Sequence, residues 1–150
     1  MVALAESDFG SLRGFPLRSR FIERGRDDIR PEVACRIRPI VASKAGALAS
    51  IACARAADVG SGALTFRSND DPVLVAGRLR ELPPAPETPV VVSWNSTTAA
   101  LTDWSLFTDR WDQFCHAAAD DLTVWPMGGA WTLCYRRYEV FQFRSCSHVC

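Results

Sequence analysis

The sequence contains no apolar run near the length of about eighteen residues that a membrane-spanning helix needs. It also has no excess charge: 17 basic and 17 acidic residues give a formal net charge of zero, so no global field attracts nucleic acid or an anionic membrane. Internal repeats and low-complexity segments are absent as well. With 48% hydrophobic and 23% charged residues, the composition is typical of a soluble globular protein, whose partners must be recognised by local patches.

The signatures of common catalytic sites are also missing. The sequence has no phosphate-binding G-x-x-x-x-G-K-[ST] or G-x-G-x-x-G loop, no H-E-x-x-H metal motif and no G-x-S-x-G nucleophile elbow. The opening MVALAESDFG lacks the basic start and apolar core of an export signal. We therefore expect a cytoplasmic protein with reduced cysteines and with no cofactor, metal or membrane association. The terminal CSHVC, residues 146–150, resembles a zinc site in composition but offers too few ligands.

In a reduced chain, cysteines are expected to behave as small hydrophobic residues. We therefore expect Cys35, Cys115 and Cys134 to be buried.

The first 31 residues show no clean hydrophobic period and contain several glycines and prolines. They predict an irregular basic N-terminal arm, residues 1–31, followed by a single α+β domain over residues 32–150. Eight arginines and four acidic residues lie between Arg13 and Arg38, so this stretch has a net charge of +4. We expect a solvated arm, with nucleic-acid binding as an alternative that the scarcity of stacking aromatics disfavours.

The hydrophobic periodicity predicts the element order βαβαβαβββ. Strands are expected over residues 33–37, 63–68, 90–94, 122–125, 131–135 and 139–143. Helices are expected over residues 43–59, 72–82 and 98–118. This order predicts an α+β or α/β fold, with a mixed sheet that ends in an antiparallel C-terminal three-strand meander and carries helices packed on it.

Aromatic residues recur at helical spacing in the stretch DWSLFTDRWDQFC, residues 103–115. On a helical wheel they form one face, made of Trp104, Phe107, Trp111 and Phe114. The other tryptophans lie in strands that we expect to receive this helix: Trp94, Trp125 and Trp131. The spacing favours a buried scaffold, and the alternative is an aromatic slot that stays open to a ligand.

Polar residues near this stretch are candidate catalytic groups. Asp112 and His116 are four residues apart, so on a helix they would face each other, and a carboxylate beside an imidazole can orient a general base. A second set of candidates follows in the chain: Asp120, Asp121 and Glu139. The plainer alternatives are an exposed ion pair and turn-forming aspartates.

Candidate binding residues are of two kinds. The three strand tryptophans Trp94, Trp125 and Trp131 could wall a pocket for a small apolar ligand. The exposed contacts with a protein partner or an anion would come from Leu106, Asp109, Arg136 and Arg137.

The C-terminal third can be written as W-x-x-F-x-x-x-W-D-x-F-C, then D-D-x-x-V-W-P, then W-x-L-x-Y and E-x-F-x-F. In this pattern, over about residues 94–144, the chain resembles uncharacterised small bacterial proteins carried in mobile, integron-type gene cassettes. The resemblance implies a bacterial origin and an accessory role, and it implies no reaction.

These observations favour a non-enzymatic accessory protein that binds a protein partner or a small apolar ligand, with an immunity-like role included. One alternative is a small hydrolase or transferase with an aromatic-walled pocket, and another is nucleic-acid binding through the arm. A homodimer formed through an edge strand or an exposed apolar patch, such as one containing Tyr138 or Phe141, is a further expectation.

Overall fold

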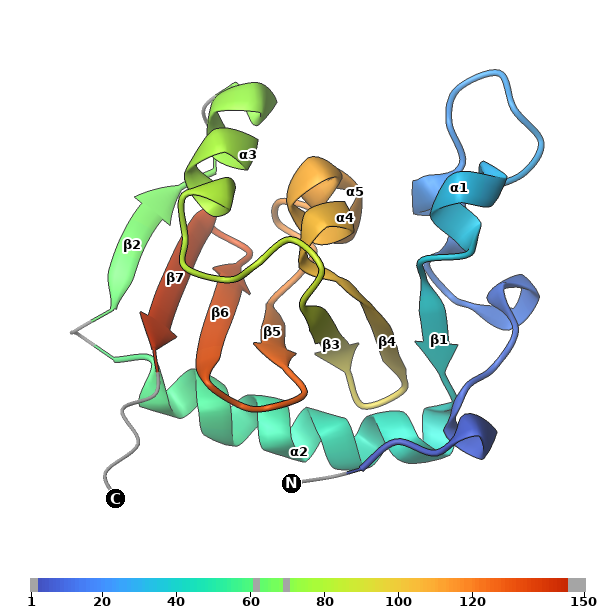
Figure 1. The fold of residues 1–150 in the computed structure, drawn as a ribbon, viewed down its shortest axis with the longest axis horizontal. Coiled ribbons are helices and arrows are strands. Elements are labelled where there is room, and N and C mark those ends of the chain that lie inside the picture. Colours follow the sequence, from blue (N-terminus) through green and yellow to red (C-terminus); the bar gives the residue numbers. More distant parts are fainter. Residues whose placement is uncertain (1–2, 61–62, 69–70, 146–150) are drawn as a thin grey trace.

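Seven strands form one sheet in the order β1-β4-β3-β5-β6-β7-β2 (Figure 1), and every neighbouring pair is antiparallel. The computed structural model describes residues 3–60, 63–68 and 71–145. The strands are β1 (Arg38–Ile40), β2 (Leu64–Arg67), β3 (Pro89–Asn95), β4 (Thr98–Asp103), β5 (Leu122–Pro126), β6 (Trp131–Arg136) and β7 (Val140–Ser145).

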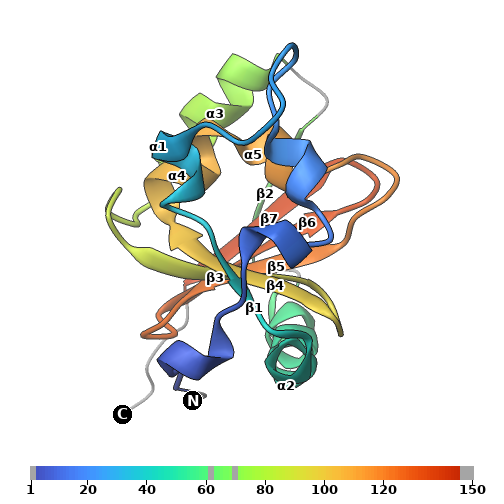
Figure 2. The same cartoon turned by 90° about the vertical axis from the view of Figure 1, so that its right-hand side faces the viewer.

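Helices cover both faces of this sheet (Figure 2). One face carries the longest helix, α2 (Ala42–Asp58), which is seen end-on in Figure 2. The opposite face carries shorter helices and turns: α1 (Pro31–Ala34), α3 (Pro72–Arg80), α4 (Trp104–Asp109) and α5 (Trp111–Phe114), with the 3-10 turns η2 (Leu12–Gly14) and η3 (Arg18–Phe21) of the N-terminal segment. The first 3-10 turn, η1 (Glu6–Asp8), lies on the α2 side, where the flanking Leu4 and Phe9 pack against the cluster that α2 buries. The fold is therefore α+β.

The prediction of a mixed sheet is wrong, because the sheet contains no parallel pair of neighbouring strands in the described chain. The helix α2 does not connect two adjacent parallel strands. It connects β1 and β2, which are the two opposite edges of the sheet. A helix of 17 residues is about 25 Å long, and six inter-strand gaps span about 29 Å. One helix therefore crosses almost the full width of the sheet, as Figure 1 shows.

The expected helix over residues 98–118 is also wrong in its first six residues, which form β4. The Asn95 carboxamide oxygen accepts hydrogen bonds from the backbone N–H and the hydroxyl of Thr97, both at 2.9 Å. This Asx turn closes a β3–β4 hairpin directly before the residues that we expected to begin the helix. The helical part begins at Trp104, capped by Asp103, and it is interrupted at Arg110 between α4 and α5.

The predicted strand over residues 33–37 is wrong as well. Pro31 occupies the first turn of α1, a position where its missing N–H costs nothing. Val33 and Ile37 are both buried, and their spacing of four fits a helical turn as well as a strand. Cys35 lies between them and is exposed, whereas Cys115 and Cys134 are buried as expected.

The remaining predicted elements are confirmed, with differences at their ends. Helices form at α2 and α3, and strands form at β2, β3, β5, β6 and β7. The positions of Ser43 and Gly60 at the ends of the expected helix also predict a side-chain cap and a left-handed turn, but α2 has no side-chain cap and Gly60 has no positive φ. The apolar pattern of residues 72–82 also predicts that Val73 is buried, which is wrong, since it is 75% exposed at the start of α3.

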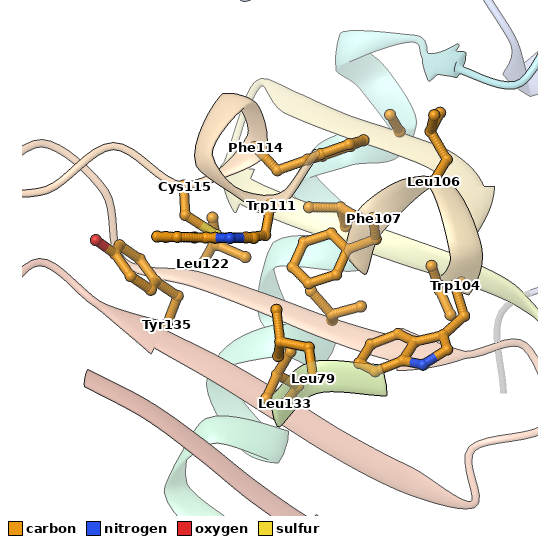
Figure 3. Close-up of a cluster of buried hydrophobic side chains, with 14 of the residues drawn as sticks. Leu79, Trp104, Leu106, Phe107, Trp111, Phe114, Cys115, Leu122, Leu133 and Tyr135 are labelled. Carbon is orange, nitrogen blue, oxygen red and sulfur yellow. The ribbon is translucent and has the colours of Figure 1, made fainter. Parts of the chain in front are cut away.

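The aromatic stripe lies in the core, as the spacing predicts (Figure 3). Trp104, Phe107, Trp111 and Phe114 are between 0% and 6% exposed. Their rings contact one another and the sheet, with Trp104 edge-on to Trp131 at 5.0 Å between ring centroids. These side chains therefore form the scaffold on which α4 and α5 are held.

The N-terminal segment is irregular, but it is not a solvated arm. Phe15, Phe21 and Ile29 are at most 6% exposed and belong to the same core as the aromatic stripe. The ring of Phe21 lies edge-on to that of Phe114, with centroids 4.9 Å apart. The expectation of a largely solvated arm is wrong, because these apolar residues pack against the core. Their irregular spacing has no helical or strand period that would have predicted this burial.

Candidate functional site

The structure does not place Asp112 and His116 face to face on one helix, because α5 ends at Phe114. Asp112 is exposed, and His116 lies in the following loop. Burial and the nearby Arg20 guanidinium lower the pKa of His116. These effects favour the neutral imidazole, and within the described chain no carboxylate is hydrogen-bonded to its ring.

The carboxylates after the helix are held separately by different arginines. Asp120 accepts hydrogen bonds from Arg20 at 2.6 and 3.2 Å and from the backbone N–H of His116 at 2.8 Å. Asp121 accepts from the backbone and guanidinium of Arg137. Glu139 lies in the β6–β7 turn with a φ of 65°. The two aspartates are therefore held by different arginines, and among the described residues no hydrogen bond or ion pair joins either of them to Glu139.

The surface candidates for partner binding are also occupied or buried. The expectation that Leu106 is exposed is wrong, since it is 2% exposed in the core. Asp109 pairs with Arg80, and the Arg136 Nε donates to Gln142 at 3.0 Å. Arg137 is engaged with Asp121.

The three strand tryptophans do not share one pocket. Trp94 and Trp131 lie on the face of α4 and α5, where the Trp94 indole N–H donates to the Phe114 carbonyl at 2.9 Å. Trp125 lies on the opposite face, against α2. The expectation that all three receive the aromatic helix is wrong for Trp125, because side chains alternate along β5 and its neighbour Val124 takes the other face.

A cleft of about 350 Å³ opens beside Trp125, between α2 and the sheet. Its walls are mostly apolar and come from three separate segments: Leu48, Ile51 and Arg55 of α2, Val91 of β3, and Trp125, Met127, Gly128 and Gly129 of β5 and the β5–β6 loop. The volume lies at the lower end of the range found for small-molecule sites. Arg55 is the only charged residue in this lining.

The Arg55 guanidinium is held in place by the sheet without a carboxylate. Its Nη1 donates to the Trp131 carbonyl at 3.2 Å and to the Thr132 hydroxyl at 2.9 Å, and its Nη2 donates to the Gly129 carbonyl at 3.4 Å. Its central carbon lies 5.7 Å from the centroid of the Trp125 ring. Across the residues that the structure describes, no acidic side chain lies within 4 Å of it.

Gly129 makes room for this guanidinium. Its φ is +76°, and a Cβ at this position would lie 2.7 Å from the Arg55 Nη2. A side chain there would meet both backbone strain and the arginine. Its neighbour Gly128 has open space around it, so the requirement is specific to one of the two loop glycines.

The sequence pattern predicted Trp125 as a binding residue. It did not predict Arg55 or the loop residues Met127 and Gly129 as part of the same site. A signal for Arg55 was present: it lies three and seven residues after Ala52 and Leu48, on the stripe that α2 buries. A charged residue on the buried stripe of an alanine-rich helix needs a polar partner, which the sheet supplies here.

The large exposed apolar residues of the described chain lie in three segments, at the start of the edge strand β2, at the start of α3 and in the β6–β7 turn: Leu64, Val73, Leu74 and Tyr138. The expectation that Phe141 is exposed is wrong, since it is fully buried. The opposite edge, β1, is covered by the N-terminal segment, where Phe9 bridges to Ile40. A dimer through the β2 edge stays a prediction.

Among residues 3–60, 63–68 and 71–145, no group of three or more His, Cys, Asp or Glu side chains is arranged to hold a metal ion. The CSHVC stretch lies outside these residues. No helix in the described ranges has the length and apolar character needed to cross a bilayer. Comparison with protein families, curated proteins and solved structures finds no match, so function must be argued from the site itself.

Proposed function

We propose that the protein binds a small amphipathic anion in the cleft between α2 and the sheet. The observation that carries this proposal is an arginine without a carboxylate partner at the wall of an otherwise apolar cleft. A partly buried cation is costly unless it is paired, and the Trp125 ring compensates only in part. An anion with an apolar body would supply the missing charge and cover the apolar walls.

The unused donors of Arg55 fit this ligand. A guanidinium has five N–H groups, and three are directed at Trp131, Thr132 and Gly129. The remaining two are on Nε and Nη2. Arg36 uses this same pair of nitrogens to hold the carboxylate of Asp103, so the protein already contains the arrangement that we propose for the ligand.

A purely structural role for Arg55 would also explain its three hydrogen bonds, since they tie α2 to the β5–β6 loop. The two roles differ in their consequences. A structural arginine affects only the free energy of unfolding, whereas a binding arginine also determines which ligands the cleft accepts.

Two aromatic probes of equal shape separate these roles. We expect naphthoate, an anion, to bind more tightly than neutral naphthamide by at least about tenfold, because charged hydrogen bonds contribute about 1.5–3 kcal/mol. Isothermal titration calorimetry measures both affinities. Arg55→Gln and Gly129→Ala should each weaken naphthoate binding, the second by displacing the guanidinium.

Two control variants test the specificity of this result. Arg24→Gln removes an exposed positive charge remote in sequence from the cleft, and Gly128→Ala adds a methyl group where the loop has space. Both should bind naphthoate like the natural chain. Equal affinities for the two probes, or unchanged naphthoate binding by Arg55→Gln, would overturn the proposal.

A further inference from the structure

Another cavity, of about 360 Å³, lies at the N-terminal end of α2, on the β1 edge of the sheet. Figure 2 views α2 end-on from this side. The walls come from the N-terminal segment, from the junction of β1 with α2 and from the start of β4. Among the described residues that line the cavity none is charged, and none also lines the cleft between α2 and the sheet.

The N-terminus of α2 forms part of this wall and has no side-chain acceptor. The helix begins at Ala42 after Val41, which provides no side-chain cap, and its first turn contains no acidic residue. Within the described chain, no group accepts a hydrogen bond from the Ala42 backbone N–H. The first N–H groups of a helix point away from its body, so the positive end of a 17-residue helix is open to the cavity. Such an end binds oxyanions.

Thr98, the first residue of β4, contributes an independent donor to the same cavity. Its side chain is buried, with the residue 3% exposed, yet its hydroxyl makes no hydrogen bond within the described chain. The described polar atoms that are sealed in the core without a partner belong to other residues, so the Thr98 oxygen opens onto the cavity that the residue lines. A ligand atom that accepts from this hydroxyl would satisfy it.

The charged groups beside the first turn of α2 pair with each other. The Asp8 carboxylate lies 3.8 Å from the Lys44 Nζ and accepts the Ala5 backbone N–H at 2.8 Å. Asp8 contacts the end of the helix through its backbone carbonyl, which accepts from the Val41 N–H at 2.8 Å. The cavity therefore offers uncharged donors and no full positive charge, which suits a monoanion better than a dianion.

We propose that this cavity binds a small organic carboxylate, whose oxygens accept from the Ala42 N–H and the Thr98 hydroxyl. The Ser11 hydroxyl also lines the cavity; it accepts a backbone hydrogen bond at 3.1 Å and still has its own proton to donate. The apolar body of the ligand would contact Phe15 and Pro39. This site is separate from the proposed function, because the two cavities share no residue.

Benzoate and neutral benzamide test this site by NMR titration of the full chain, which follows each backbone N–H separately and so distinguishes the two cavities. We expect benzoate to shift the N–H signals of Ala42 and Thr98 and to saturate at least about fivefold more tightly than benzamide, because only benzoate interacts favourably with the helix dipole as an ion.

Ala42→Pro removes the N–H donor at the first helical position, where proline is tolerated. It should weaken benzoate binding at this site at least about fivefold without lowering the midpoint of thermal unfolding. Ala42→Val is the matched control, since it keeps the N–H and adds similar bulk. It should keep the affinity within about twofold of the natural chain.

Thr98→Val and Thr102→Val form a second matched pair, because both residues lie on the same face of β4. Thr102 is 5% exposed, and its hydroxyl donates to the Arg36 carbonyl at 2.8 Å. Thr98→Val should weaken benzoate binding at least about threefold and leave the unfolding midpoint unchanged, whereas Thr102→Val should lower the midpoint and keep the affinity.

A cavity that holds only water would give a different set of results. Benzoate would leave the signals of Ala42 and Thr98 unshifted, or it would bind no more tightly than benzamide. Either result would overturn the proposal, as would benzoate binding that is unchanged in both Ala42→Pro and Thr98→Val.

Discussion

Asp103 is the last residue of β4, and its side chain caps the N-terminus of α4. One carboxylate oxygen accepts from the Leu106 backbone N–H at 2.8 Å, and the other accepts from the Arg36 Nε at 2.9 Å. Burial acts to raise the pKa of Asp103, but the hydrogen bonds from Arg36 and Leu106 outweigh it, so the pKa lies below 3.8. The charged form is therefore the stabilising form.

We predict that Asp103→Asn, which keeps a capping oxygen but loses the charge, lowers the free energy of unfolding by about 1 kcal/mol at neutral pH, because Arg36 is partly exposed. Asp103→Ala should lose about 1 kcal/mol more, since it also removes the cap. Urea unfolding measures both values.

The pH dependence follows from the direction of the Asp103 pKa shift. Because the folded-state pKa is lower than the unfolded value, the contribution is complete above 3.8 and is lost as pH falls through the folded-state pKa. The natural chain should therefore lose more stability than Asp103→Asn between pH 7 and acid conditions. Parallel losses in the two proteins would contradict this account.

At the scale of the element, the two short helices α4 and α5 depend on their buried rings rather than on helical hydrogen bonding. They contain six and four residues, lengths at which isolated helices are unstable. The spacing of three and four residues still predicted which rings are buried. The break at Arg110 separates the two helices but leaves the aromatic rings of both directed at the core. The prediction of burial was therefore more robust than the prediction of helix length.

We predict that Phe107→Ala lowers the free energy of unfolding by about 3–5 kcal/mol, because Phe107 is fully buried between Trp104 and Phe114. Tyr138→Ala, which removes an aromatic ring that is 63% exposed, should change it by less than about 0.5 kcal/mol. Chemical denaturation followed by tryptophan fluorescence gives both values. Similar effects at the two positions would contradict the proposed scaffold role.

Across the whole molecule, the N-terminal segment is joined to the rest by packing and by ion pairs. Phe21 contacts Phe114, and the neighbouring Arg20 holds Asp120, with both charged side chains at most 14% exposed. Five of the eight arginines between Arg13 and Arg38 pair with carboxylates. Little unpaired charge is therefore left there for a nucleic acid.

We predict that Phe21→Ala lowers the free energy of unfolding of the entire chain by about 3–5 kcal/mol, with one cooperative transition. Circular dichroism and tryptophan fluorescence should give the same midpoint. Arg24→Ala, at an exposed position in the same segment, should have little effect. Two separate transitions would instead show that residues 1–31 fold independently of the domain.

The sequence by itself limited the fold to the α+β or α/β class, and it determined the three antiparallel C-terminal strands and the burial of the aromatic stripe. These follow from local periodicity, which depends on residues a few positions apart. It also suggested Trp125 as a binding residue, although for the wrong face of the sheet.

The tertiary structure decided what depends on distant segments. Thr98–Asp103 has the composition of a helix, and pairing with β3 makes it a strand. The same holds for the cleft, where Arg55, Trp125 and Gly129 meet only because α2 crosses the sheet from one edge to the other. The spacing of residues along the chain does not predict that crossing. The contact between α2 and the β5–β6 loop is therefore visible only in the tertiary structure.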